Sequence, residues 1–134
     1  MVDVARPVVD SDILIDYLRG GGPGLDLVRQ VIRRSGYRVT AVTAFELALG
    51  RSYRESPRPV HALLAAPVLM LTRKAALRGG ALLADLRRSG AQIDVRDAMQ
   101  AGICLEADAT LVTRNVSHFQ RVPGLRLSDP AELT

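Results

Sequence analysis

Four polar residues that are far apart in the sequence have the types and positions that metal-dependent chemistry needs. Asp10 ends one predicted strand, and Glu46 lies one helical turn beyond another. Asp97 opens a predicted helix, and Asn115 follows a further strand by two residues. Carboxylates gathered in one cleft raise one another's pKa and destabilise the fold unless a cation is present. Mg²⁺ or Mn²⁺ suits such an all-oxygen set, and it can polarise a phosphoryl oxygen and activate water.

Each of these residues also has a structural explanation. Asp10 is suited to cap a helix, and Glu46 has the spacing of a capping box. Asp97 lies where the helix dipole favours an acid, and Asn115 favours a turn. Helix capping explains each position alone, but it does not explain why acids should converge at one place. Convergence is therefore the observation that separates the two interpretations.

Convergence depends on the elements that hold these residues. The apolar patterning predicts strands at 6–10, 38–42, 67–71, 109–113 and 125–127, and helices at 13–18, 25–36, 43–53, 61–66, 72–88 and 94–106. Strands that alternate with helices indicate an α/β fold, with a parallel sheet covered on both faces. Ligands of such sheets bind at the carboxyl ends of the strands. All four polar positions are expected at that edge.

The composition indicates a single globular domain over residues 1–134. The chain is 48% hydrophobic and 24% charged, which excludes disordered and collagen-like classes. Cys104 is the single cysteine, so neither a disulfide framework nor a structural zinc site is expected. There is no signal-peptide pattern and no apolar run long enough to span a membrane, so we expect a soluble cytoplasmic protein.

The charge balance favours an anionic partner. Seventeen Arg and one Lys give a formal net charge of +4, and the isoelectric point is about 10.0. Such a protein attracts polyanions, although an arginine excess can also reflect coding bias. An acidic pocket on a basic protein is the layout expected of a metal-dependent nuclease.

Three segments of the chain resemble the motifs of PIN domains in the right order. VVDSDILIDYL (8–18) is similar to the opening motif and TAVTAFELALG (40–50) to the second. IDVRDAMQAGICLEADATLVTRNVSHFQRVPGLRL (93–127) resembles the C-terminal signature of VapC toxins. The resemblance implies a PIN-like three-layer αβα sandwich with a central, mainly parallel sheet of four to five strands. It also implies a Mg²⁺- or Mn²⁺-dependent endoribonuclease that cuts structured RNA such as tRNA or ribosomal RNA.

The same resemblance implies partners and residue roles. The toxin would form a homodimer, would be silenced by a VapB-type antitoxin, and would reach promoter DNA only through that antitoxin. By motif position, Asp10 would be the first metal ligand and Glu46 the second acid. Asp97 would be the third acid and a metal ligand, and Asn115 would occupy the fourth position.

Further residues would support this site. Ser11 and Thr113 would supply hydrogen bonds, and Arg114 is the best candidate for a phosphate contact. His118 stands where the family signature commonly has Asp, and Asn115 is neutral, so the pocket is less negative than an all-acid version. We therefore expect one tightly held ion, with a second recruited by the phosphate. Asp16 is expected to pair with Arg19 or to face solvent.

Two other functions fit parts of the sequence. The segment VVDSD (8–12) fits an aspartyl-nucleophile phosphatase, with Asp10 attacking phosphorus, Asp12 as general acid and Lys74 holding the phosphoryl group. In that hypothesis Asp94 and Asp97 bind Mg²⁺. Alternatively, the chain is a catalytically weak PIN scaffold that acts only within a repressor complex.

Overall fold

In the part of the chain that the structure describes, five short strands form the centre, and all of their pairings are parallel. The computed structural model describes residues 6–34 and 36–130. The strands are β1 (Val8–Val9), β2 (Val39–Thr40), β3 (Val68–Leu69), β4 (Thr110–Val112) and β5 (Arg126–Ser128). β4 lies between β1 and β5, β2 pairs with β3, and a parallel bridge from Val8 to Arg38 joins the two groups. The order across the sheet is therefore β3-β2-β1-β4-β5, which confirms the predicted parallel sheet.

Eight helices surround these strands in the described part of the chain. They are α1 (Ser11–Arg19), α2 (Pro23–Arg34), α3 (Ala41–Leu49), α4 (Arg51–Glu55), α5 (Pro57–Leu63), α6 (Arg73–Arg88), α7 (Val95–Glu106) and α8 (Val116–Phe119). The single helix predicted at 43–53 is divided into α3 and α4. Helix α3 begins at Ala41, after the Thr40 cap, and Gly50, which has extended backbone angles, separates it from α4. The short helix α8 was not predicted. None of the helices in the described ranges has the length and apolar character needed to cross a membrane.

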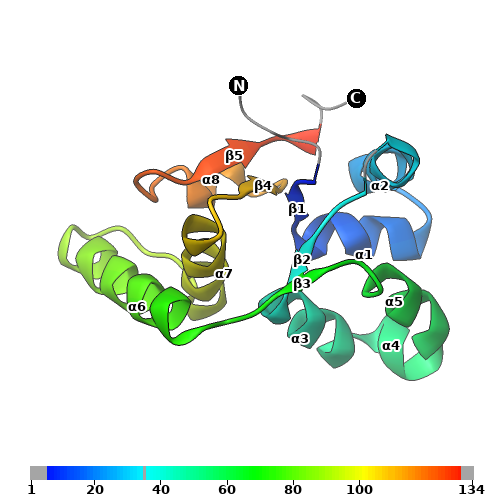
Figure 1. Cartoon of the computed structure of the whole chain (residues 1–134), viewed down its shortest axis with the longest axis horizontal. Coiled ribbons are helices and arrows are strands. Elements are labelled where there is room, and N and C mark those ends of the chain that lie inside the picture. The colour runs from blue at the N-terminus through cyan, green and yellow to red at the C-terminus, as the bar shows by residue number, and fades with distance from the viewer. Residues whose placement is uncertain (1–5, 35, 131–134) are drawn as a thin grey trace.

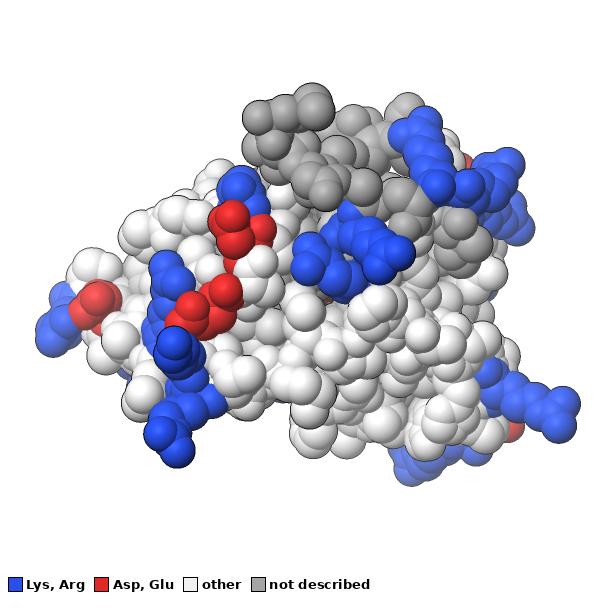
Figure 2. All heavy atoms as spheres, viewed as in Figure 1, with Lys and Arg blue, Asp and Glu red and all other residues white. Residues whose placement is uncertain are grey.

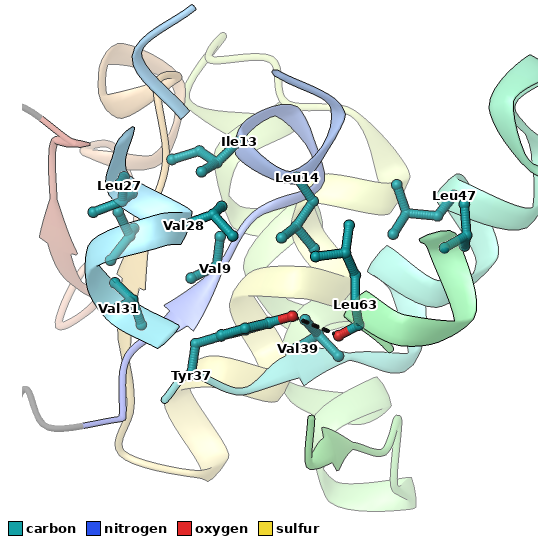
Figure 3. Close-up of a cluster of buried hydrophobic side chains, with 12 residues drawn as sticks. Val9, Ile13, Leu14, Leu27, Val28, Val31, Tyr37, Val39, Leu47 and Leu63 are labelled. Carbon is teal, nitrogen blue, oxygen red and sulfur yellow. Dashed lines mark hydrogen bonds between the residues drawn. The ribbon is translucent and has the colours of Figure 1, made fainter. Parts of the chain in front are cut away.

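The helices lie on both faces of the sheet, as Figure 1 shows for α1 and α2 on one side and α6 and α7 on the other. Successive strand residues point to opposite faces. Val9 and Val112 pack with apolar side chains of α1, α2, α3 and α5, in the cluster of Figure 3. Val8 and Leu111 pack instead with α7 and with Phe119 of α8. The three-layer αβα sandwich is thereby confirmed.

Helix α7 is held very close to α6 by two glycines. A Cβ atom added to Gly79 would lie 2.7 Å from the carbonyl oxygen of Ala98. A Cβ atom added to Gly102 would lie 2.4 Å from the carbonyl oxygen of Ala75. Such distances are shorter than real Cβ contacts, so the two helices approach through their backbones. This contact fixes the helix that carries Asp97.

Candidate active site

The candidate site lies at the carboxyl edge of the sheet, where the strand order reverses. Asp10 directly follows β1 and Thr113 directly follows β4, and these two strands are neighbours. The backbone N–H of Asp10 donates to the carbonyl of Val112 over 2.9 Å, which continues the ladder to the strand ends. In open α/β sheets, ligands bind at this kind of switch point.

Asp10 is a buried carboxylate with three hydrogen-bond donors. Its side chain accepts from the Ser11 backbone N–H over 2.9 Å, the Gln100 amide over 3.1 Å and the Thr113 hydroxyl over 2.7 Å. Asp10 is only 6% exposed. Burial raises its pKa, and the three hydrogen bonds oppose that rise. Asp10 thus caps α1 and also lies at the centre of the predicted site.

Glu46 reaches this site from α3. Its Oε1 accepts a hydrogen bond from the Ser11 hydroxyl over 3.2 Å, and its Oε2 lies 3.8 Å from the Arg96 guanidinium. The capping-box interpretation is wrong here, because the cap of α3 is Thr40. Burial raises the pKa of Glu46, and the charges of Asp10 and Asp97 raise it further. The link through Ser11 connects the second acid to the first.

Asp97 lies in the first turn of α7, after Asp94 has capped the helix by accepting from the Arg96 backbone N–H over 2.8 Å. Burial raises the pKa of Asp97, and the charges of Asp10 and Asp94 add to the rise. His118 opposes it, which places this histidine within electrostatic reach of Asp97. The charge of Asp10 therefore contributes to the raised pKa of both other acids, and the joint role of the three acids at one metal ion stays a prediction.

The donor set fits a hydrated divalent ion better than a protein cage. Within residues 6–34 and 36–130, no three acidic, His or Cys side chains lie close enough together to form a metal centre by themselves. Mg²⁺ keeps several of its waters and is usually held by one or two carboxylates. Burial is the main cause of the raised pKa of Glu46 and of Asp97, and repulsion by the charge of Asp10 adds to it. One ion bound through Asp10 and a second acid would relieve this repulsion.

Arg114 lies beside the site and is tied to α1. Its backbone N–H donates to Asp12 over 3.1 Å, and its guanidinium lies 3.8 Å from Asp12 and 3.3 Å from Asp16. Asp16 is buried and also accepts from the Gly24 backbone N–H over 3.1 Å. The expectation that Asp16 pairs with Arg19 or faces solvent was wrong. Arg114 thus fastens the loop after β4 to α1, and a phosphate contact by its guanidinium stays a prediction.

The remaining predicted residues follow β4. The backbone N–H of Asn115 donates to the Thr113 hydroxyl over 3.0 Å, so the hydroxyl that holds Asp10 also orders the start of α8. The side chains of Asn115 and His118 are exposed beside the site. The roles of both residues stay predictions.

The sequence did not point to Gln100, Thr40 or Thr43, which form a buried polar group beneath Asp10. Gln100 is 2% exposed, and both threonines are fully buried. The available signal was the position of Gln100, one helical turn after Asp97 in a run of small and apolar residues. A polar residue on the same face as a candidate ligand could have been added to the site.

The phosphatase hypothesis does not fit this arrangement. It needs Lys74 beside the same site as Asp97, but Lys74 lines a surface hollow with Glu106, at the other end of α7. Those two ends are separated by about 13 Å along the helix axis. Asp12, the supposed general acid, is engaged by Arg114.

The surface charges do not form one continuous basic area on the face that Figure 2 shows. Lys and Arg side chains stand there in separate groups, some of them next to acidic side chains. Some of the arginines are paired with acids at the surface, as in the ion pairs Arg78–Glu106 and Arg126–Asp108. Such pairs contribute little to stability, so the net charge matters mainly for attraction of anions.

Comparisons with known proteins match most of the chain. The family model of the PIN domain matches residues 8–125. Ribonuclease VapC19 of Mycobacterium tuberculosis is 33% identical over 123 residues, which cover 89% of this chain and 96% of that protein. The tRNA(fMet)-specific endonuclease VapC of Salmonella typhimurium is 29% identical over 96 residues, or 68% of this chain and 73% of that protein.

The fold is similar to a solved structure as well. The crystal structure of DNA-bound VapBC from Salmonella typhimurium has a TM-score of 0.76 at 21% identity, and the match covers 93% of this chain and 98% of that one. The range matched by the family model contains Asp10, Glu46, Asp97 and Asn115.

Proposed function

The chain belongs to the PIN domain family, and on that basis we propose that it is a Mg²⁺- or Mn²⁺-dependent endoribonuclease, the toxin of a VapBC-type toxin–antitoxin pair. One observation carries the proposal: Asp10, Glu46 and Asp97 come from three different elements that meet at Asp10. Ser11, next to Asp10, donates to Glu46, and Gln100, one turn after Asp97 on α7, donates to Asp10. The charge of Asp10 raises the pKa of both other acids. A divalent cation is the ligand that makes this arrangement favourable.

Each residue of the site has a proposed task. Asp10 would hold the ion together with Asp97 or Glu46, and these acids must be deprotonated to do so. When bound, the ion supplies a Lewis acid that polarises the phosphodiester and lowers the pKa of water. Ser11 keeps Glu46 turned toward Asp10, and Thr113 fixes Asp10 from the neighbouring strand. The amide of Asn115 contacts the phosphate without adding negative charge.

The proposed substrate is structured RNA, such as tRNA or ribosomal RNA. The relatives named above include a tRNA(fMet)-specific endonuclease and a ribonuclease. The net charge of +4 favours a polyanion, and the aromatic content of 4% leaves few platforms for base stacking. We therefore expect the protein to bind mainly the RNA backbone and to act in the cytoplasm, where these RNAs are found.

The proposed partners are a VapB-type antitoxin and a second copy of the chain, with promoter DNA bound only through the antitoxin. One structural relative is a DNA-bound VapBC complex. Apolar side chains beside the site also support a protein partner, because Phe45 is 59% exposed and Val95 is 51% exposed. Phe45 lines a groove of about 230 Å³ together with Leu71, Arg96 and Met99. Because Phe45 directly precedes Glu46 in the chain, a partner bound in this groove could also cover the candidate site.

Cleavage of a panel of structured RNAs by the purified, antitoxin-free chain tests this function. We expect cleavage with Mg²⁺ or Mn²⁺ and none in EDTA, and Asp10→Asn or Asp97→Asn should abolish it. Asp26→Asn is the matched control, because Asp26 is an exposed acid in the first turn of α2. It should cleave like the wild type.

Two outcomes would contradict the proposal. Cleavage that persists in Asp97→Asn or in EDTA would remove the metal-dependent mechanism. No cleavage of any RNA, with the metal present and the antitoxin absent, would favour the scaffold that acts only in a repressor complex.

A further inference from the structure

We propose that Gln100 is a positioning residue that selects which oxygen of Asp10 is available to a metal ion. The inference rests on the proposed function, since it concerns the same site. Gln100 lies on α7, Asp10 follows β1, and the hydrogen bond between them joins positions 90 residues apart. Because Gln100 is 2% exposed, no water competes for its amide.

The orientation of the Gln100 amide is fixed by its other partners. The Thr40 hydroxyl oxygen accepts from the backbone N–H of Thr43 over 3.1 Å. Its hydrogen has two acceptors within reach, Oγ1 of Thr43 at 3.5 Å and the nearer Oε1 of Gln100, so it is donated to Gln100. With Oε1 held there, Nε2 must face the other way. It donates to Oδ1 of Asp10 and to Oγ1 of Thr43, each over 3.1 Å. Both amide hydrogens and the carbonyl are thereby used.

This orientation determines how the Asp10 carboxylate is occupied. A carboxylate offers about four acceptor positions, two on each oxygen. Oδ1 accepts from the Ser11 backbone and from Gln100, whereas Oδ2 accepts from Thr113 alone among residues 6–34 and 36–130. The remaining acceptor position therefore belongs to Oδ2. Without the Gln100 amide, Oδ1 would have an equal vacancy and the carboxylate could rotate.

Gln100 also links the first and third acids. It lies on the same helix as Asp97, one turn later, so the hydrogen bond to Asp10 fixes α7 relative to the end of β1. Residues that orient a metal-binding group in this way typically change metal affinity by about 10–100-fold when they are removed. If Gln100 only formed hydrogen bonds within the core, its replacement would lower stability without changing metal affinity.

A matched pair of variants separates these two roles. Gln100→Met has a similar length and loses the bond to Asp10. Thr43→Val is nearly isosteric, and it damages the same buried group but keeps that bond. Mn²⁺ binding to the full chain, without RNA, is measured by titration calorimetry, and stability by thermal unfolding. We expect both variants to be destabilised, with Mn²⁺ affinity about 10-fold or more weaker in Gln100→Met and nearly unchanged in Thr43→Val.

The outcomes distinguish this inference from the proposed function. Mn²⁺ uptake that depends on Asp10 but is equal in Gln100→Met and wild type would overturn the role of Gln100 alone. Equal losses of affinity in Thr43→Val and Gln100→Met would also overturn it, because disruption of the core would then explain both. A wild type that takes up no Mn²⁺, or an uptake that survives in Asp10→Asn, would overturn the metal site and this inference together.

A second measurement needs no folded Gln100 variant. In the ¹⁵N-labelled wild type, the side-chain amide signal of Gln100 should shift on addition of Mg²⁺, because Mg²⁺ polarises the carboxylate that it contacts. The exposed side chains of Gln92 and Gln120 serve as internal references. The Asp10→Asn variant should lose the shift. A Gln100 signal that stays in place while Mg²⁺ binds would contradict the inference.

Discussion

Gly79→Ala and Gly80→Ala form a matched pair that tests how α7 is positioned. Both residues lie within α6, and both substitutions add one methyl group to the helix. At Gly79 that methyl group would lie 2.7 Å from the carbonyl oxygen of Ala98 and 3.3 Å from its carbonyl carbon. At Gly80 nothing lies within 4 Å of it. The backbone that would be displaced at Gly79 directly follows Asp97.

These contacts predict a difference between the two variants in the free energy of unfolding. Replacing a helical Gly by Ala gains about 0.5–1 kcal/mol through chain entropy, and this gain is common to both. Overpacking against backbone costs about 1–3 kcal/mol, and it applies only to Gly79. The free energy of unfolding should therefore rise by about 0.5–1 kcal/mol in Gly80→Ala. Gly79→Ala should be less stable than Gly80→Ala by about 1–3 kcal/mol.

Urea unfolding of both variants and the wild type measures this difference, with unchanged slopes confirming that the same surface is exposed. RNA cleavage should fall in Gly79→Ala and stay at the wild-type level in Gly80→Ala. Equal stabilities of the two variants would refute the reasoning, because the close approach of α6 and α7 would then have no energetic consequence.

The titratable groups and one buried hydrogen bond give two further predictions. Burial and the charge of Asp10 raise the pKa of Asp12 from 3.8 to about 6 in the folded protein. Protonated Asp12 therefore stabilises the fold fully below pH 3.8, and this stabilisation is lost as the pH rises to about 6. In EDTA we expect a higher Tm at about pH 5 than at about pH 7, with a weaker dependence in Asp12→Asn; a Tm that rises over this interval would contradict the assignment. Tyr37 donates to the Leu63 carbonyl over 2.6 Å (Figure 3), and Tyr37→Phe should lower the free energy of unfolding by about 1 kcal/mol in urea. Because burial raises the pKa of Tyr37 from 10.0 to about 12, stability is lost in the wild type as pH rises through that interval, and a variant with the same alkaline loss would exclude this cause.

The sequence predicted the parts of the fold that depend on local patterning. Short β-branched runs such as 38–42 and 109–113 contain strands, and the long periodic segments 72–88 and 94–106 contain α6 and α7. Asp10 and Glu46 were found because each follows a strand, and parallel strands end at one edge of a sheet. Asp97 was found because it opens a helix. Their positions depend on the order of the elements and the direction of the strands, and both can be predicted from the sequence pattern.

Contacts between distant segments could not be predicted in this way. The hydrogen bond from Gln100 to Asp10 and the ion pair from Arg114 to Asp16 join elements that meet only after folding. Glycine within a helix weakens it by propensity, and only the packed structure shows the backbone of α7 against Gly79. Helix α8 has four residues, fewer than hydrophobic periodicity can reveal.

The capping interpretation of Glu46 failed for a local reason. Thr40 precedes Thr43 and already accepts the Thr43 backbone N–H, so the helix begins earlier than the capping-box spacing suggested. Glu46 then lies beyond the first turn and contacts Ser11 instead. Because Thr40 already caps the helix, Glu46 is not needed as a cap and its carboxylate is available to the candidate site.

The central claim about this protein is that a divalent cation binds among acids that come from different elements. Anomalous diffraction from a crystal of the metal-free protein soaked in Mn²⁺ tests this claim directly. We expect one strong peak in contact with Oδ2 of Asp10 and with an oxygen of Asp97 or Glu46, and no such peak in Asp10→Asn. Peaks only at other acids, or an ordered site without any peak at saturating Mn²⁺, would contradict it.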